Sequence, residues 1–285
     1  MKMAVIGCGL IGGSMALSWK RAGIVDEVIA FGHNPATLQK ALDKGAADTV
    51  TTSMEEAVKD ADIVVSAVPV EAMESVFTEM APFLKSDAVV TDVGSTRQTV
   101  IAAARKGLGD KFHQYAPAHP IAGGEMPGVD YASADLFDEK VVISTPDEGM
   151  DPKVVTFIEE AWRKAGARVQ AMSPLQHDLT FASVSHLPHV LAYALVDMIA
   201  REENAQEKLK MAGAGFRDFT RIASSSPVMW RDICLSNREA LSHELERYRA
   251  SLDTLQKYID ESDGKALESV FENAVRNRRG LVFPG

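Results

Sequence analysis

A glycine-rich segment near the N-terminus has the spacing that binds the pyrophosphate of a dinucleotide. Gly7, Gly9 and Gly12 satisfy the G-x-G-x-x-G pattern and stand between a strand-like run, 4–6, and a helical pattern, 15–20. The first glycine allows a tight turn, the second lets the backbone approach the phosphates, and the third lets helix and strand pack closely, with the helix N-terminus facing the anion. The cofactor-binding residues predicted in this segment are Gly7, Gly9, Leu10, Ile11 and Gly12.

The tip of the second predicted strand bears on the choice between NAD and NADP. NAD-binding sheets place an acidic residue about 20 residues after the glycines, where it binds the adenosine ribose. Here the tip carries His33 and Asn34 and no Asp or Glu. No carboxylate is therefore present to repel the 2'-phosphate of NADP, and the side chains of His33 and Asn34 can donate hydrogen bonds to this phosphate. No arginine is present to bind the phosphate strongly. NAD or NADP is expected, with NADP slightly favoured; an exposed His33 without cofactor contact is the alternative.

Two later strand ends should meet the cofactor at the same edge of the sheet. Val68 and Pro69 end one predicted strand, and Ser95 follows another. Ligands of open α/β sheets bind outside the carboxyl ends of the strands, so Ser95 is placed to reach both nicotinamide and substrate. Ser95 also has the residue type of an N-cap for the helix that follows.

His119 lies in a segment, 115–125, that is rich in proline and glycine. We expect an ordered active-site loop there, because the segment is too rich in proline and glycine for a helix and too polar for a buried strand. The ordinary pKa of histidine, about 6.5, lets it take a hydroxyl proton while the same carbon loses hydride to a nicotinamide. A lone histidine is more often structural, but beside a dinucleotide motif His119 is favoured as a catalytic base.

The elements that would position these residues form two halves. Apolar runs at 3–6, 28–31, 63–68, 88–93 and 141–144 alternate with helical patterns. Such runs, apolar on both faces, indicate a parallel sheet with helical crossovers. The predicted fold class is α/β, with a doubly wound, mostly parallel Rossmann-type sheet in a dinucleotide-binding domain, 1–172, followed by an all-helical dimerisation domain, 173–285.

The helical half should need a second copy of the chain to bury its apolar helix faces. Long amphipathic helices are expected over 174–203, 227–262 and 265–279, with Pro188 kinking or dividing the first. A domain of about a hundred residues cannot bury all the apolar faces of helices this long. We therefore expect a homodimer that forms through the helical domain.

Composition excludes several other classes. The net charge of −10, without a long basic run, argues against nucleic-acid binding. The apolar stretch 187–200 is too short to cross a bilayer, so no membrane segment is expected. Cys8 and Cys234 lie far apart and indicate a reducing compartment, hence a cytoplasmic location. No Cys/His cluster has metal-binding spacing, and no metal is expected.

Five ordered motifs, spread over nearly the whole chain, occur together in one known family. They are the glycine-rich start, Asp92-Val93-Gly94-Ser95, Ala118-His119-Pro120-Ile121-Ala122-Gly123, Ser185-His186-Leu187-Pro188-His189 and Gly215-Phe216-Arg217-Asp218-Phe219-Thr220-Arg221-Ile222-Ala223. In these the chain resembles the prephenate and arogenate (cyclohexadienyl) dehydrogenases of tyrosine biosynthesis. The resemblance implies oxidative decarboxylation of prephenate to 4-hydroxyphenylpyruvate, of arogenate to tyrosine, or of both, with hydride transfer to NAD(P).

The resemblance also implies roles for individual residues. His119 hydrogen-bonds the ring hydroxyl of the substrate and assists its deprotonation, and Ser95 orients both groups. Arg221 binds the ring carboxylate, and His189 contacts the substrate's side chain. Two more matched positions lie near the mouth of the substrate site: Glu125 and Trp230, the latter from the same subunit or from the partner.

Arg217 and Asp218 are further substrate-binding candidates. Arg217 lies four residues before Arg221, which on a helix places both guanidinium groups on one face, and such groups bind carboxylates in a bidentate manner. The alternative is that Asp218 pairs with either arginine on a solvated surface. Asp218 or Glu125 could favour the ammonium group of arogenate, but a partly solvated carboxylate gives weak selectivity, so prephenate versus arogenate stays open.

For two further histidines, His186 and His177, the resemblance gives no specific role. We expect His186 to be structural, because Pro188 disturbs its alignment with His189. No role can be derived for His177. Neither a fused chorismate mutase nor a regulatory domain after Gly280 is expected, so feedback inhibition by tyrosine would have to act at the active site.

Other functions remain open at this point. β-Hydroxyacid dehydrogenases and imine reductases share the glycine-rich start and a helical second domain. Many hydroxyacid dehydrogenases use a lysine of the helical domain, however, and the candidates, Lys208 and Lys210, lie in a charged stretch of solvated character. A non-catalytic nicotinamide-binding redox sensor would need neither His119 nor Arg221.

Overall fold

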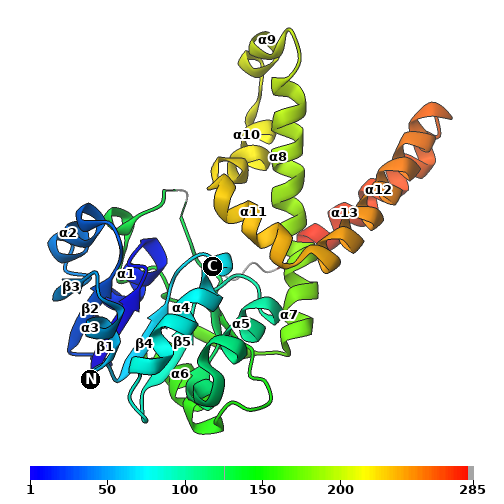
Figure 1. The fold of residues 1–285 in the computed structure, drawn as a ribbon. Coiled ribbons are helices and arrows are strands. Elements are labelled where there is room, and N and C mark those ends of the chain that lie inside the picture. Colours follow the sequence, from blue (N-terminus) through cyan, green and yellow to red (C-terminus); the bar gives the residue numbers. More distant parts are fainter. Residues whose placement is uncertain (125, 282–285) are drawn as a thin grey trace.

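The first half of the chain folds around a parallel six-stranded sheet in the computed structural model, which describes residues 1–124 and 126–281 (Figure 1). The spatial order of the strands is β3-β2-β1-β4-β5-β6. The strands are β1 (Lys2–Ile6), β2 (Glu27–Phe31), β3 (Thr49–Thr51), β4 (Ile63–Ser66), β5 (Val89–Asp92) and β6 (Tyr115–Ala116). The order reverses between β1 and β4, where dinucleotides cross the edge of such sheets. This sheet, followed by a helical half, confirms the predicted fold class.

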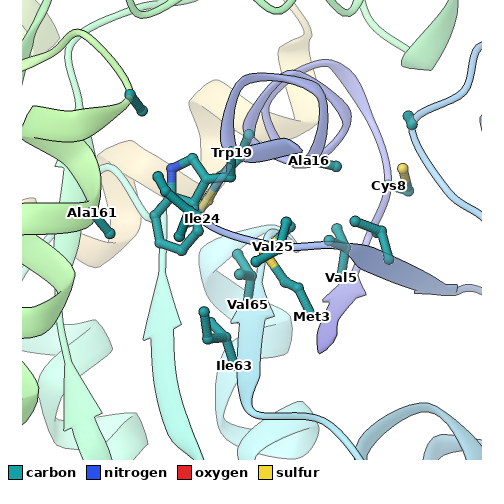
Figure 2. Packing of buried hydrophobic residues seen from close by; sticks show 14 of the residues in the cluster. Met3, Val5, Cys8, Ala16, Trp19, Ile24, Val25, Ile63, Val65 and Ala161 are labelled. Atoms are coloured by element: carbon teal, nitrogen blue, oxygen red, sulfur yellow. The ribbon is translucent and has the colours of Figure 1, made fainter. Parts of the chain in front are cut away.

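Both faces of the sheet are buried. Met3 and Val5 belong to one apolar cluster, while Ala4 and Ile6 belong to another, as the two-residue period of a strand requires. The first cluster includes residues of α1 (Leu10–Arg21), α2 (Pro35–Asp43) and α6 (Pro152–Lys164), and the second includes residues of α3 (Met54–Val58), α4 (Met73–Met80) and α5 (Gln98–Leu108). Figure 2 shows part of the first cluster, with Trp19 of α1 close to the strand residues.

A second, three-stranded sheet carries the proline-rich segment. Its order is β7 (Ala118–Pro120), β8 (Val141–Ser144) and β9 (Arg168–Ala171), with β7 antiparallel to β8. The expectation of a loop over 115–125 is therefore wrong for its first part, which forms β6 and β7. Proline is tolerated there because β7 is an edge strand. The run 141–144 is a strand, as expected, but it belongs to this small sheet rather than to the large one.

The second half is helical among its described residues, 173–281. Its helices are α7 (Pro174–Phe181), α8 (Leu187–Ala200), α9 (Ala205–Lys210), α10 (Ala214–Thr220), α11 (Pro227–Ser236), α12 (Arg238–Asp260) and α13 (Gly264–Gly280). The helices α12 and α13 form a hairpin that projects away from the sheet and from α8 (Figure 1).

Two of the helix predictions need correction. The predicted helix 174–203 is continuous from 174 to 200, because a π-helical segment, Ala182–His186, widens the turn before Pro188 and accommodates the missing amide. Pro188 therefore does not divide it. The predicted helix 227–262 is broken at Asn237, which ends α11 with non-helical backbone angles and precedes α12. The third prediction, 265–279, agrees with α13 to within a residue at each end.

The continuous helix 174–200 also overturns the length argument against a membrane span. It has 27 residues and a mean hydropathy of 1.4 in its most apolar window, so length and composition alone would let it cross a bilayer. Its N-terminal part nevertheless carries His177 and Asp178, which are buried and face the sheet domain, where Asp178 hydrogen-bonds to α5. Buried ionisable groups paired with another element are features of a helix that packs inside a protein.

Candidate active site

The glycine-rich turn between β1 and α1 has the shape that a pyrophosphate requires. Gly7 has φ of +93°, and a Cβ atom there would lie 2.7 Å from the carbonyl oxygen of Ala67. A Cβ on Gly12 would lie 2.5 Å from the carbonyl oxygen of Gly7, so neither position tolerates a side chain. Gly9, in contrast, faces open space, and as N-cap of α1 it has no side-chain hydrogen bond. The open space beside Gly9 lies at the start of α1, whose first amides have no acceptor within the helix and can bind an anion.

The other predicted cofactor residues lie at the same carboxyl edge of the sheet. Leu10 and Ile11 begin α1, directly after β1, and Val68 and Pro69 follow the end of β4. Because β1 and β4 are parallel neighbours, their ends adjoin. The loop around Gly124 also approaches this edge, since a Cβ there would lie 3.3 Å from the side chain of Leu10.

The tip of β2 presents His33 and Asn34 to solvent. The His33 ring is edge-on to Phe31, with 5.2 Å between ring centroids. The side-chain oxygen of Asn34 accepts a hydrogen bond of 2.9 Å from the amide of Ala36 and so caps α2. This cap occupies the Asn34 oxygen and leaves its amino group available to donate.

Ser95 is partly buried in the bend that follows β5, but it is not the N-cap of α5. That part of the prediction is wrong, because Arg97 occupies the cap position without capping through its side chain. The capping group comes instead from the helical half. The two carboxylate oxygens of Asp178 accept hydrogen bonds of 2.8 and 2.9 Å from the amides of Arg97 and Gln98. A carboxylate at this helix end is favoured by both hydrogen bonding and the helix dipole.

A buried charge cluster links the end of β5 to the strand of His119. Arg97 and Asp92 are both fully buried and form an ion pair of 2.6 Å. The hydroxyl of Tyr115 donates to Asp92 at 2.5 Å, and Arg97 donates to the carbonyl of Ala118 at 3.3 Å. Burial, followed by the charge of Asp92, raises the pKa of Tyr115 well above its ordinary value. This cluster was not predicted from the sequence, where its only local signal is an acidic and a basic residue five positions apart.

His119, on β7, hydrogen-bonds a second histidine from α7. Its Nδ1 lies 2.8 Å from Nε2 of His177, and Nδ1 of His177 lies 2.8 Å from Oδ1 of Asp178. Burial, followed by unfavourable electrostatic interactions with His177, Arg97 and His186, lowers the pKa of His119 well below the ordinary value. The imidazole of His119 is therefore neutral at neutral pH and able to accept a proton.

The two partners of His119 have shifted pKa values as well. Burial lowers the pKa of His177, although its hydrogen bond to Asp178 acts in the opposite direction. Burial opposes the charge of Asp178, but hydrogen bonds from His177 and from the amides of Gln98 and Arg97 lower the pKa of its carboxyl overall. His177, for which the sequence suggested no role, thus lies between the candidate base and a carboxylate.

His189 and Trp230 form a second group. Their rings stack with 3.6 Å between centroids and 20° between planes. Nδ1 of His189 donates to the carbonyl of Ser185 at 2.9 Å, which leaves Nε2 as an acceptor. Burial, opposed by the Ser185 bond and assisted by the charge of Arg221, lowers the pKa of His189. Arg221 and Trp230 therefore both lie close to His189.

His186 lies between the group of His119, His177 and Asp178 and the group of His189 and Trp230. It is buried, lies close enough to His177 and His189 to be affected by their charges, and receives a hydrogen bond of 3.1 Å from Asn237. Burial lowers the pKa of His186 to about 4. The Asn237 side chain also donates to the backbone carbonyl of Asp178 at 2.8 Å, so the break between α11 and α12 supports the same region.

The remaining candidates lie on or next to α10. Arg217 and Asp218 are exposed on this helix, and Arg221 begins the 3₁₀ turn that follows it. In the part of the chain that the structure describes, the charge of Arg221 acts on His189. Glu125 lies outside the described residues. Across the same described part, no group of three or more His, Cys, Asp or Glu side chains is arranged to hold a metal.

Two models of one protein family match the two halves of the chain. Residues 15–171 match the family model described as the nucleotide-binding domain of prephenate dehydrogenase, and residues 173–273 match the one described as its dimerization domain. The chain belongs to the prephenate dehydrogenase family. This membership decides against the hydroxyacid dehydrogenases and imine reductases that share the glycine-rich start.

Relatives with different named substrates are similar over nearly the whole length. The chain is 36% identical over 281 residues to a cyclohexadienyl dehydrogenase of Zymomonas mobilis, covering 98% of this chain and 95% of that protein. A crystal structure of prephenate dehydrogenase from A. aeolicus, in complex with hydroxyphenyl propionate and NAD+, superposes with a TM-score of 0.90 at 35% identity, covering 98% of each chain. An arogenate dehydrogenase from Synechocystis superposes with a TM-score of 0.82 at 27% identity, covering 99% of this chain and 100% of that one.

Proposed function

We propose that this protein oxidatively decarboxylates prephenate, arogenate or both, in tyrosine biosynthesis. The family membership gives the reaction class. The observation that carries the proposal is the neutral, partly buried His119, hydrogen-bonded to His177 at the junction of a dinucleotide-binding sheet and the helical half. A sensor that only binds nicotinamide would not need such a base.

In the proposed reaction the chain supplies a base and an anchor. His119 accepts the proton of the ring hydroxyl, and Ser95 orients the hydroxyl and the imidazole. A bound nicotinamide would accept the hydride from the ring carbon that carries this hydroxyl. The ring carboxylate then leaves as carbon dioxide, and the ring becomes aromatic, which makes the loss favourable.

The helical half is proposed to hold the substrate. Arg221 binds the ring carboxylate, with Arg217 as a second cation, while His189 contacts the substrate's side chain and Trp230 lies near the mouth of the site. The stacked rings of His189 and Trp230, with the charge of Arg221 beside them, support this placement. Glu125 is proposed near the mouth of the site, and Asp218 is proposed as a further substrate-binding residue.

The cofactor is proposed to be NAD or NADP. The absence of a carboxylate from the tip of β2 and the free amino group of Asn34 support acceptance of a 2'-phosphate, with NADP slightly favoured. The contact residues are proposed to be Gly7, Gly9, Leu10, Ile11, Gly12, His33, Asn34, Val68, Pro69 and Ser95.

We also propose a cytoplasmic homodimer that forms through the helical domain, with the domain boundary at 172/173. Of the twenty large apolar side chains that are exposed in the described residues, sixteen lie beyond residue 172. Exposed apolar surface gathered on one half of a molecule is typical of an interface. The two cysteines are free thiols, which supports a reducing compartment.

Four assays test the activity, in which prephenate or arogenate is paired with NAD or NADP and the absorbance of the reduced cofactor is followed. We expect turnover in at least one pairing. No reduction in any of the four would refute the proposal and favour the non-catalytic sensor. The relative kcat/KM values would decide both the substrate and the cofactor.

A further inference from the structure

We infer that His177 and Asp178 are positioning residues that hold His119 in a single tautomer, with the proton on Nδ1 and the lone pair on Nε2 available to the substrate. This inference rests on the proposed role of His119 as the base. The contacts that determine the tautomer join β7, α5 and α7 through Asp178 and His177.

The surroundings of Asp178 favour an ionised carboxylate. Oδ1 accepts the amide hydrogen of Arg97, and Oδ2 accepts that of Gln98. These hydrogen bonds, with the one to His177, lower the pKa of the Asp178 carboxyl, which is therefore ionised at neutral pH and can only accept. Oδ1 also lies 2.8 Å from Nδ1 of His177, so that nitrogen is the donor.

This assignment determines the state of both histidines. With its proton on Nδ1, neutral His177 has a lone pair on Nε2, which lies 2.8 Å from Nδ1 of His119. A hydrogen bond between these two nitrogens then requires the proton to be on Nδ1 of His119. The Nε2 atom of His119 is consequently an acceptor. The lowered pKa values of both rings agree with neutral imidazoles.

The arrangement also prepares His119 for its charged state. When Nε2 takes the substrate's proton, Nδ1 already donates to His177, whose far side faces the negative charge of Asp178. The developing imidazolium is stabilised through the intervening ring, and no proton has to reach Asp178. Since α5 amides hold Asp178 in place, little reorganisation is needed at the moment of reaction.

A purely structural role for His177 makes the opposite prediction about substitutions. Its ring packs on Phe181, with 4.4 Å between centroids. Phenylalanine at position 177 would preserve an aromatic ring but remove the acceptor for His119. Glutamine would lose the ring but offer a carbonyl oxygen as acceptor.

The decisive experiment compares His177→Phe with His177→Gln in the full-length enzyme, using whichever substrate and cofactor the parent turns over. We expect His177→Phe to lower kcat by about 10²-fold or more with KM changed by less than about threefold, as for a base with the wrong tautomer. His177→Gln should retain kcat within about tenfold of the parent. The reverse order, with His177→Phe more active, would overturn the inference.

A second measurement needs neither a variant of His177 nor any turnover. Nitrogen-15 NMR of the labelled parent protein, with the His119 signals assigned by their loss in His119→Asn, reports which ring nitrogen is protonated. We expect a protonated Nδ1 and an unprotonated Nε2. A protonated Nε2 in the neutral ring would refute the inference even if the enzyme is active. If no substrate is turned over, the function proposal fails while the spectrum still decides the tautomer.

Discussion

Trp19 and Trp162 are fully buried between the sheet and its helices, whereas Phe271 and Leu235 in the helical half are 55% and 60% exposed. The first half completes its own core, because each strand face meets a helix of the same chain. The second half orders its ionisable groups next to the sheet, at His177, Asp178 and His186, and leaves much of its apolar surface uncovered. The ionisable groups of the site are thus ordered by contacts between the two halves, while the uncovered apolar surface of the helical half agrees with the proposed dimer.

Substitutions in the two halves should therefore affect different properties of the protein. Residues on the sheet side should govern the chemical step, because His119 and the glycine-rich turn lie there. Residues of the helical half beyond the junction should govern substrate binding and assembly. The largest effects are expected for the base itself.

His119→Asn should lower kcat by about 10²-fold or more with a modest change in KM, because assistance to proton transfer is lost. Steady-state kinetics with the preferred substrate measure it. His113→Asn is the matched control, since His113 is an exposed histidine of the same half. Equal activity of the two variants would remove His119 from the chemical step.

Arg221→Ala should raise KM by about 10- to 100-fold, with a smaller change in kcat, because a hydrogen bond to a charged group of the substrate is lost. The control is Arg201→Ala, another exposed arginine of the helical half, which pairs with Asp197. A fall in kcat at unchanged KM would contradict the division between chemistry and binding.

Phe271→Asp should weaken the proposed dimer, because a carboxylate would replace an exposed apolar side chain of α13 that the dimer is proposed to bury. Sedimentation velocity over a range of protein concentrations measures the change, and we expect monomer to increase by about tenfold or more at low concentration. Phe83→Asp, on the exposed surface of the sheet half, should leave assembly unchanged. If Phe271→Asp sediments like the parent, α13 is not part of the interface.

The smallest expected effect is the pH dependence of stability due to His186. Its folded pKa, about 4, is below the ordinary histidine value of about 6.5, so the unfolded chain binds the proton more readily in this window. Stability should therefore be fully present above pH 6.5 or so and decline as the pH falls toward 4. Thermal unfolding followed across this range should show a lower Tm at acidic pH, by a few degrees.

His186→Gln should reduce the slope of this dependence, while His119, His177 and His189, whose pKa values are also lowered, keep their own contributions. Glutamine keeps a polar group beside Asn237 but does not titrate. An unchanged slope in the variant would assign the pH dependence to other groups.

The local sequence was sufficient to predict most of the sheet and the glycine-rich turn. Strands β1, β2, β4, β5 and β8 follow from apolar runs, and the turn follows from three glycines whose backbone shape is a local property. Strands β3, β6, β7 and β9 were missed, since each has only two to four residues and forms only through its neighbours. The break of the predicted helix 227–262 at Asn237 also went unseen, because Asn237 hydrogen-bonds to Asp178 and His186 from another helix.

The fold class, the dinucleotide motif and the identity of His119 as a candidate base follow from the order of the amino acids, since they depend on local period, turn geometry and side-chain chemistry. The surroundings of that base depend instead on tertiary packing. His119 meets His177 across 58 positions, and Asp178 caps α5 across 81. Such contacts arise when packing brings distant segments together and buried polar groups must find partners, which no local pattern encodes.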